Sequence, residues 1–166
     1  HEILISAKQG YAIRFSGRQV RPVSRVSKGV KGLNLRKDDE ISSIMLVDSD
    51  PELKLLTITE KGYGKRTPIE EYRIQGRGGM GIIDIQTGER NGKAIGVLQV
   101  NNDDRVMLIT NAGQVIKIPV ANIRECHRNT KGVRCMKVDN KDWIVSMVKV
   151  PEDETEDDEL SEVEGE

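Results

Sequence analysis

The chain has 166 residues and a formal net charge of −1, from 26 Lys and Arg against 27 Asp and Glu. That length allows one domain or a few small repeats with a modest core. No apolar run approaches the roughly 18 residues of a membrane span, and no signal peptide is visible, so we expect a cytoplasmic protein with no membrane partner. Because the chain begins at His1, almost inside an apolar run, we also expect it to be part of a longer protein.

The charge is divided unevenly along the chain. Residues 151–166 contain ten acidic residues and no basic one, which leaves 17 acidic against 26 basic residues, a net of +9, in residues 1–150. Dense blocks of like charge repel themselves and bury little, so we expect residues 151–166 to form a disordered acidic tail. The basic remainder predicts a polyanionic partner.

Three units of about fifty residues follow one another along the chain. They align without gaps on Gly10, Gly62 and Gly113. Four residues after each of these glycines is a cation, namely Arg14, Arg66 and Lys117. Fifteen residues after each is an arginine, namely Arg25, Arg77 and Arg128. Nineteen residues after each is a second glycine, namely Gly29, Gly81 and Gly132. Such a period indicates a repeat architecture.

Each unit contains four short apolar or alternating segments, typical of strands. In chain order these are 3–5, 11–15, 30–35 and 41–47, then 55–58, 63–67, 81–85 and 94–100, then 106–109, 114–118, 133–138 and 144–150. Four strands per fifty residues is typical of a propeller blade. We predict an all-β, propeller-like fold with three four-stranded blades, at residues 1–50, 51–102 and 103–150.

The glycine-rich segment 75–81 satisfies G-x-G-x-x-G through Gly76, Gly78 and Gly81. A dinucleotide site needs a helix to begin directly after this motif. The residues that follow alternate like a strand and then reach a turn, so we expect a loop of the repeat here and no nucleotide site.

Metal and catalytic sites are not expected. Cys126, His127 and Cys135 are one ligand short of a structural zinc site, and the sequence offers no second cysteine pair. Reduced cysteines in strands explain them more simply. Only two histidines occur, and no pairing of a nucleophile with a base is visible, so we expect no enzymatic activity from this chain alone.

Several motifs resemble one known family. Residues 61–68 read KGYGKRTP and are followed by Glu71-Tyr72-Arg73, residues 110–117 read TNAGQVIK, and residues 129–134 read NTKGVR. Together they resemble, across residues 1–150, the C-terminal domain of the DNA gyrase A subunit, which is known as a β-pinwheel and wraps DNA. The resemblance implies six blades, of which these look like the last three.

The segment QGRGGMG at 75–81 is similar to that family's gyrase-A box, Q-(R/K)-R-G-G-(R/K)-G. Gln75, Arg77, Gly78, Gly79 and Gly81 match, whereas Gly76 and Met80 each stand where the box has a cation. The resemblance implies that the complete box, the catalytic residues, and the ATP and Mg²⁺ of the parent enzyme lie outside this sequence. No cofactor is expected here.

Repetition of one charge at one offset predicts a cationic belt around the blades. Phosphate contacts of this kind carry affinity without sequence information. The residues expected to contact DNA are Arg14, Arg25, Lys28, Lys65, Arg66, Arg73, Gln75, Arg77, Gly78, Gly79, Gly81, Lys117, Arg128, Lys131 and Arg134.

The expected partner is bent double-stranded DNA. The resemblance further implies two protein partners in the bacterial cytoplasm at the nucleoid, namely the gyrase B subunit, plus the rest of the gyrase A subunit. It also implies chiral DNA wrapping that supports ATP-dependent negative supercoiling. Two alternatives remain open: the C-terminal domain of topoisomerase IV, and a propeller-like module that binds acidic proteins.

Overall fold

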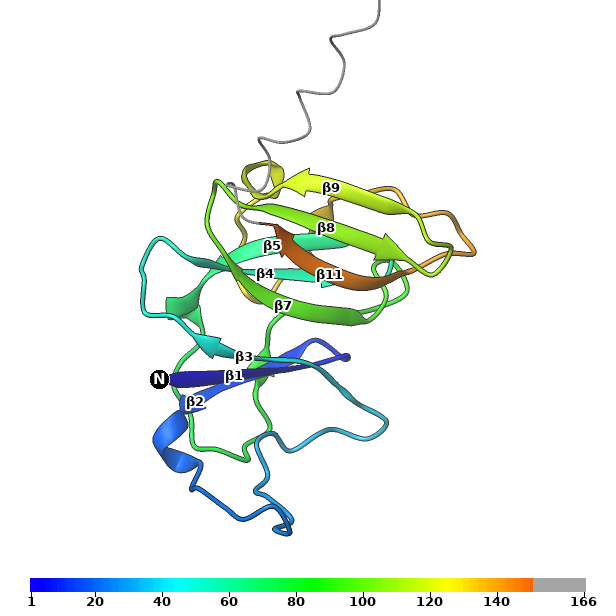
Figure 1. Ribbon diagram of the computed structural model, residues 1–166. Coiled ribbons are helices and arrows are strands. Elements are labelled where there is room, and N and C mark those ends of the chain that lie inside the picture. The colour runs from blue at the N-terminus through cyan, green and yellow to red at the C-terminus, as the bar shows by residue number, and fades with distance from the viewer. Residues whose placement is uncertain (151–166) are drawn as a thin grey trace, which may run out of the picture.

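The computed structural model describes residues 1–150; the predicted acidic tail, 151–166, lies outside the described residues. Within residues 1–150 the chain forms eleven strands and three short 3-10 helices, with no α-helix, so the all-β prediction is confirmed (Figure 1). The strands are β1 (Glu2–Ala7), β2 (Tyr11–Ser16), β3 (Ile41–Val47), β4 (Lys54–Thr59), β5 (Tyr63–Pro68), β6 (Ile82–Ile83), β7 (Ala94–Val100), β8 (Arg105–Thr110), β9 (Val115–Pro119), β10 (Val133–Arg134) and β11 (Ile144–Val150). The 3-10 helices η1 (Gly17–Gln19), η2 (Ile69–Glu71) and η3 (Val120–Asn122) directly follow β2, β5 and β9.

The strands form three antiparallel sheets; in Figure 1 the first lies below the other two, which overlap in this view. The strand orders are β3-β1-β2-β6, β10-β5-β4-β7 and β11-β8-β9. In each sheet a hairpin turns at the repeat position of Gly10, Gly62 or Gly113, all of which have positive φ. We call these sheets the first, second and third blade. The strands β3, β7 and β11 contact one another in sequence and define the inner edge of the stack.

The fourth strand of a blade comes from the following unit. Strand β6, from the second unit, pairs with β2 of the first blade, and β10, from the third unit, pairs with β5 of the second blade. The prediction that each unit supplies all four of its own strands is therefore wrong, and so is the strand predicted at 30–35, which forms none. The counterparts of this segment, β6 and β10, each pair with the blade before their own, and the described residues contain no such blade for 30–35 to join.

The third blade correspondingly has three strands among the described residues. Because β6 and β10 belong to the sheet of the preceding unit, a boundary between sequence units does not coincide with a boundary between sheets. The division into units 1–50, 51–102 and 103–150 remains a proposal about repeats in the sequence.

The core lies between blades and consists of branched aliphatic side chains, in keeping with the single Phe and Trp. One cluster joins the first two blades and includes Leu4, Leu55 and Tyr72. Another joins the second and third, and includes Ile58 and Leu108. A third cluster lies within the first unit, where Leu33 packs with Ile13 and Phe15. Blades therefore bury apolar side chains against their neighbours, as in other repeat architectures, and the first also buries some within its own unit.

The repeat glycines near the blade junctions yield a stability prediction. Gly132 has φ +70°, and a Cβ atom there would lie 2.7 Å from the carbonyl oxygen of Gly64 in the second blade. Gly29, its counterpart in the first unit, has φ +74° but no atom within 4 Å of the same position. Both Gly→Ala changes place an alanine in the left-handed conformation, which costs about 1–2 kcal/mol of folding free energy. Only Gly132→Ala adds a steric clash, which costs about a further 1–3 kcal/mol.

We therefore expect Gly132→Ala to lower the free energy of unfolding in urea by clearly more than Gly29→Ala. Equal losses in the two variants would show that the close approach of the two backbones does not limit this position.

Candidate nucleic-acid interface

The cation four residues after the hairpin glycine joins two blades. Arg14 on β2 donates from Nη1 to the carbonyl oxygens of Ile69 (3.0 Å) and Tyr72 (3.1 Å) in the next unit. Its Nε lies 2.5 Å from the Glu2 carboxylate, and its side chain is only 16% exposed. The guanidinium is thus already satisfied by protein groups.

Arg66 makes the equivalent contact one blade further on. Its Nε donates to the carbonyl oxygen of Ile123 at 2.6 Å, and its Nη1 donates to the side-chain oxygen of Asn102. Ile123 stands in the third unit where Tyr72 stands in the second. The backbone repeats the link, since Gln75 N–H donates to Arg14 O (2.8 Å) and Cys126 N–H to Arg66 O (2.9 Å).

The arginine 15 residues after the hairpin glycine makes a second link, toward the preceding unit. Arg77 donates from Nη1 to the carbonyl oxygen of Lys31 at 2.6 Å, and Arg128 donates from Nη1 to that of Ile83. Lys31 and Ile83 are equivalent in the repeat. We call these four arginines, Arg14, Arg66, Arg77 and Arg128, the inter-blade arginines; each is half-buried and holds backbone of a neighbouring unit.

Lys65 is fully buried, so its prediction as a DNA contact is wrong for the folded chain. Its ammonium donates to the carbonyl oxygens of Asp84 (2.6 Å) and His127 (2.8 Å), and also to that of Arg128. The side chain alternates inward on β5, where Ile13 occupies the same repeat position in the first blade.

A buried polar cluster surrounds Lys65. The carboxylate of Asp84 accepts hydrogen bonds from Thr57 Oγ1 at 3.0 and 3.1 Å and from the hydroxyl of Tyr72. Burial lowers the pKa of Lys65 to about 8, although the nearby Asp84 charge acts in the opposite direction. Burial likewise raises the pKa of Asp84, which Lys65 and the two hydroxyls oppose.

The box-like loop 75–81 packs on the first unit. Gly78 N–H donates to Gly32 O at 2.7 Å, and Gly79 O accepts from Asn34 N–H at 2.9 Å. A Cβ at Gly81 would lie 2.6 Å from the carbonyl oxygen of Ala12. The glycines of this loop therefore serve close approach between units, and the Gly78 amide is already taken by protein backbone.

The remaining predicted cations are exposed. Of the sequence-based set, these are Arg25, Lys28, Arg73, Lys117, Lys131 and Arg134. The sequence analysis missed further exposed cations near them, such as Arg21, Lys31, Arg124 and Lys137. A repeat offset could have found two of these, because Arg21, Arg73 and Arg124 each lie 11 residues after a hairpin glycine, whereas Lys31 and Lys137 have no cation at the matching position of every unit.

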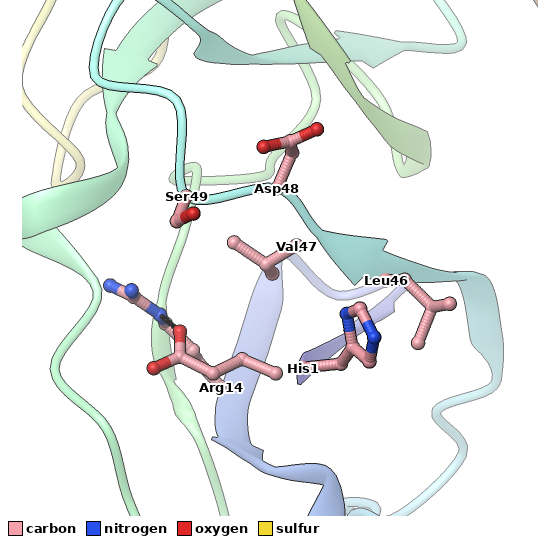
Figure 2. Close-up of a pocket in the computed structure, with 7 residues that line it drawn as sticks. His1, Arg14, Leu46, Val47, Asp48 and Ser49 are labelled. Carbon is pink, nitrogen blue, oxygen red and sulfur yellow. Dashed lines mark hydrogen bonds and ion pairs between the residues drawn. The ribbon is translucent and has the colours of Figure 1, made fainter.

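A groove of about 450 Å³ beside Arg14 is shown in Figure 2. Asp48 and Ser49, from the segment after β3, line it together with Glu2. With two carboxylates and an arginine that is already bound, this groove is unsuited to an anion.

Metal ligands, cysteines and helix lengths can be stated for residues 1–150. Residues 1–150 contain no group of three His, Cys, Asp or Glu side chains placed to hold a metal ion. Cys126 and Cys135 are both unpaired thiols there, and burial raises the pKa of Cys135 to about 11. None of the helices in this range is long or apolar enough to cross a membrane.

Comparison with known proteins identifies similar sequences. Residues 1–48, 53–101 and 104–151 each match the family described as DNA gyrase C-terminal domain, beta-propeller. The DNA gyrase A subunit of Kosmotoga olearia is 45% identical over 148 residues, which cover 89% of this chain and 18% of that protein. The DNA gyrase A subunit of Staphylococcus epidermidis is 39% identical over 153 residues, which cover 92% of this chain and 17% of that protein. The chain thus spans less than a fifth of the length of these relatives.

Solved structures share the fold. A DNA gyrase A C-terminal domain superposes with a TM-score of 0.82 at 26% identity, covering 89% of this chain and 50% of that one. The C-terminal domain of DNA topoisomerase IV superposes with a TM-score of 0.84 at 25% identity, covering 92% of this chain and 47% of that one. The backbone fold therefore does not separate the two kinds of protein, whereas the sequence matches favour gyrase A.

The inter-blade arginines predict a difference between two equivalent positions. Arg66→Ala should lower the free energy of unfolding by about 2 kcal/mol, because its charge-assisted hydrogen bonds to the Ile123 carbonyl in the third unit and to the Asn102 side chain are lost. Lys117→Ala, at the same repeat position in the third blade, removes an exposed side chain and should stay within about 0.5 kcal/mol of the parent chain. Urea unfolding of both variants measures this, and equal effects would refute the linking role of Arg66.

Lys65 predicts a dependence of stability on pH. The pKa of Lys65 is about 10.5 in the unfolded chain and about 8 in the folded one. Between pH 8 and pH 10.5 the unfolded state therefore binds more protons than the folded state. Raising the pH from about 8 to about 10 should therefore increase its contribution to the free energy of unfolding, by about 2 kcal/mol. Measured as parent chain minus Lys65→Met, this difference should grow with pH; a difference that shrinks would reverse the assigned pKa shift.

Proposed function

This chain belongs to the DNA gyrase C-terminal domain family, and from that membership we propose that it binds double-stranded DNA and wraps it with little sequence specificity. The observation that carries the proposal is the match of all three units to this family, over residues 1–48, 53–101 and 104–151. The DNA gyrase A relatives, 45% and 39% identical, agree with it.

The free cations are arranged suitably for a DNA backbone. Arg25, Arg73 and Lys131 are exposed and lie in the loops that follow β2, β5 and β9. These strands lie on the far side of β1, β4 and β8 from the inner edge formed by β3, β7 and β11. Successive blades therefore present cations along the outer side of the stack, which suits a continuous phosphate backbone.

The fold offers little for reading bases. Residues 1–150 contain no α-helix to enter a major groove. The whole sequence has five Phe, Trp and Tyr residues, of which Phe15, Tyr63 and Tyr72 are buried, so base stacking on single strands is poorly supported. Duplex deformability then remains as the source of any sequence preference.

For the longer protein, we propose the role that the family resemblance implies. The chain would act together with a gyrase B subunit, plus the rest of a gyrase A subunit, in the cytoplasm at the nucleoid. Wrapping of fixed handedness would support ATP-dependent negative supercoiling. The strand-passage residues, ATP and Mg²⁺ would belong to other parts of that enzyme.

Two other functions can be tested against this one. A topoisomerase IV domain shares the fold, at 25% identity, but the 45% and 39% identical relatives are gyrase A proteins. A module that binds acidic proteins would use the same exposed cations. It would prefer an acidic peptide to duplex DNA of equal charge at every salt concentration.

A salt titration of duplex binding tests the proposed function. If each blade neutralises about two phosphates, log K should fall with log salt at a slope near −5. Replacing Arg25, Arg73 and Lys131 by alanine should make the slope shallower by about 2 to 3, at about 0.9 per phosphate contact. None of these three is an inter-blade arginine, so the fold should persist.

A charge-matched control uses three cations that already pair with carboxylates. Lys8, Lys54 and Lys149 face Glu40, Glu125 and Asp104 respectively. Replacing all three by alanine changes the net charge by the same amount and should leave the slope near its parent value. No measurable duplex binding by the parent chain at low salt, or equal slopes in the two triple variants, would contradict the proposed surface.

A further inference from the structure

The first two blades each contain a groove around a tyrosine that directly follows the hairpin glycine. In the first blade the groove measures about 260 Å³ and surrounds Tyr11. In the second it measures about 320 Å³ and surrounds Tyr63. The two are equivalent, because Tyr11 pairs with Ile83 of β6 just as Tyr63 pairs with Arg134 of β10.

The walls of the two grooves differ in charge at matching positions. The neutral residues Gln9, Ile83 and Gln86 line the groove of the first blade. The Arg36 guanidinium stacks on the Tyr11 ring, with its carbon 3.2 Å from the ring centre, and its Nη1 donates to the carbonyl oxygen of Met80 at 2.7 Å. One repeat later, cations line the groove of the second blade in their places, as Lys61, Arg134 and Lys137. The fold therefore tolerates neutral residues at all three positions, so the cations are not required to build the groove.

Two guanidinium groups of the second groove lie over the Tyr63 ring. The guanidinium carbons of Arg90 and Arg134 lie 5.1 and 5.5 Å from the centre of the Tyr63 ring, and Arg134 Nη2 donates to the Tyr63 hydroxyl at 3.1 Å. Stacking on an aromatic face orients a guanidinium without consuming its charge. Hydrogen bonds from both arginines also lower the pKa of Tyr63.

The charge of the groove is not cancelled within it. Lys61, Arg90, Arg134 and Lys137 face two carboxylates, Asp139 and Asp142, which leaves a net of two positive charges. Throughout residues 1–150, none of these four cations lies within ion-pair distance of a carboxylate. Lys61 donates one hydrogen bond to the carbonyl oxygen of Glu89, which leaves its charge without a carboxylate partner.

We propose that the groove around Tyr63 is a binding site for a phosphate group, one that the equivalent groove around Tyr11 lacks. Two oriented guanidinium groups flanked by two ammonium groups suit phosphate oxygens, which accept paired N–H donors. Arg134 lies three residues from the exposed Lys131, so the groove continues the outer cationic surface. The phosphate comes from a DNA backbone, which rests on the proposed function, or from a free oligophosphate.

The decisive variant gives the second groove the residues of the first. Lys61→Gln, Arg134→Ile and Lys137→Gln together copy Gln9, Ile83 and Gln86, a set that this fold already accommodates. The triple Lys8, Lys54 and Lys149 to alanine variant matches its change in net charge. The probes are a short DNA duplex, followed through the salt dependence of binding, and tripolyphosphate, followed through the ring resonances of Tyr63 by NMR in the full 166-residue chain.

With both probes the groove variant should differ from the parent chain and from the charge-matched control. Its DNA salt slope should be shallower by about 2 to 3, and tripolyphosphate should shift the Tyr63 resonances of the parent chain and the control but not those of the variant. If tripolyphosphate shifts Tyr63 while the variant's DNA slope is unchanged, the site stands and its phosphate is a free one.

The proposal and the proposed function can fail separately. Tripolyphosphate that leaves Tyr63 unaffected, together with equal DNA slopes for the groove variant and the parent chain, overturns the phosphate site even where duplex binding persists. A parent chain that binds no duplex, but whose Tyr63 responds to tripolyphosphate, supports the site and overturns the DNA function.

Discussion

Each blade of this protein is completed by the unit that follows it, and the rest of the structure depends on that exchange. β6 and β10 supply the fourth strands of the first and second blades, and arginines hold the junctions from both directions. Arg66 donates forward to the carbonyl of Ile123, and Arg77 donates backward to that of Lys31. Backbone groups at a blade junction are removed from water and need partners. The repeat supplies these partners at fixed offsets, which is why the offsets recur without gaps.

This exchange separates the basic residues into two classes with different roles. Half-buried arginines such as Arg14 and Arg128 donate hydrogen bonds to backbone carbonyls of a neighbouring unit. Exposed residues such as Arg73 and Lys131 are accessible to a partner. The first class determines how the outer loops stack, and the second class lies on those loops. The geometry of the proposed DNA surface is therefore set in part by cations that hold neighbouring backbone.

The units are alike in backbone and have diverged in chemistry. The second blade buries Thr57 and Lys65 at positions where the first has Ile5 and Ile13, and it closes this polar cluster with Asp84. Three wall positions of its tyrosine groove carry cations where the equivalent groove of the first blade has neutral residues. A buried polar network is tolerated only when its groups find partners, and here carbonyls of the third unit provide two of them.

The sequence by itself determined the strand segments, the fifty-residue period and the family, because hairpin glycines, strand alternation and charge are local properties. It also predicted the exposed cations Arg25 and Lys131. Only the tertiary structure decided which sheet the segments 82–83 and 133–134 join, and that 30–35 joins none. It alone showed that Lys65 is buried and that the recurring arginines link blades. The physical reason is that a repeat offset records which residue types recur but not what they contact: Arg77 and Arg128 link units, whereas Arg25 at the same offset is exposed.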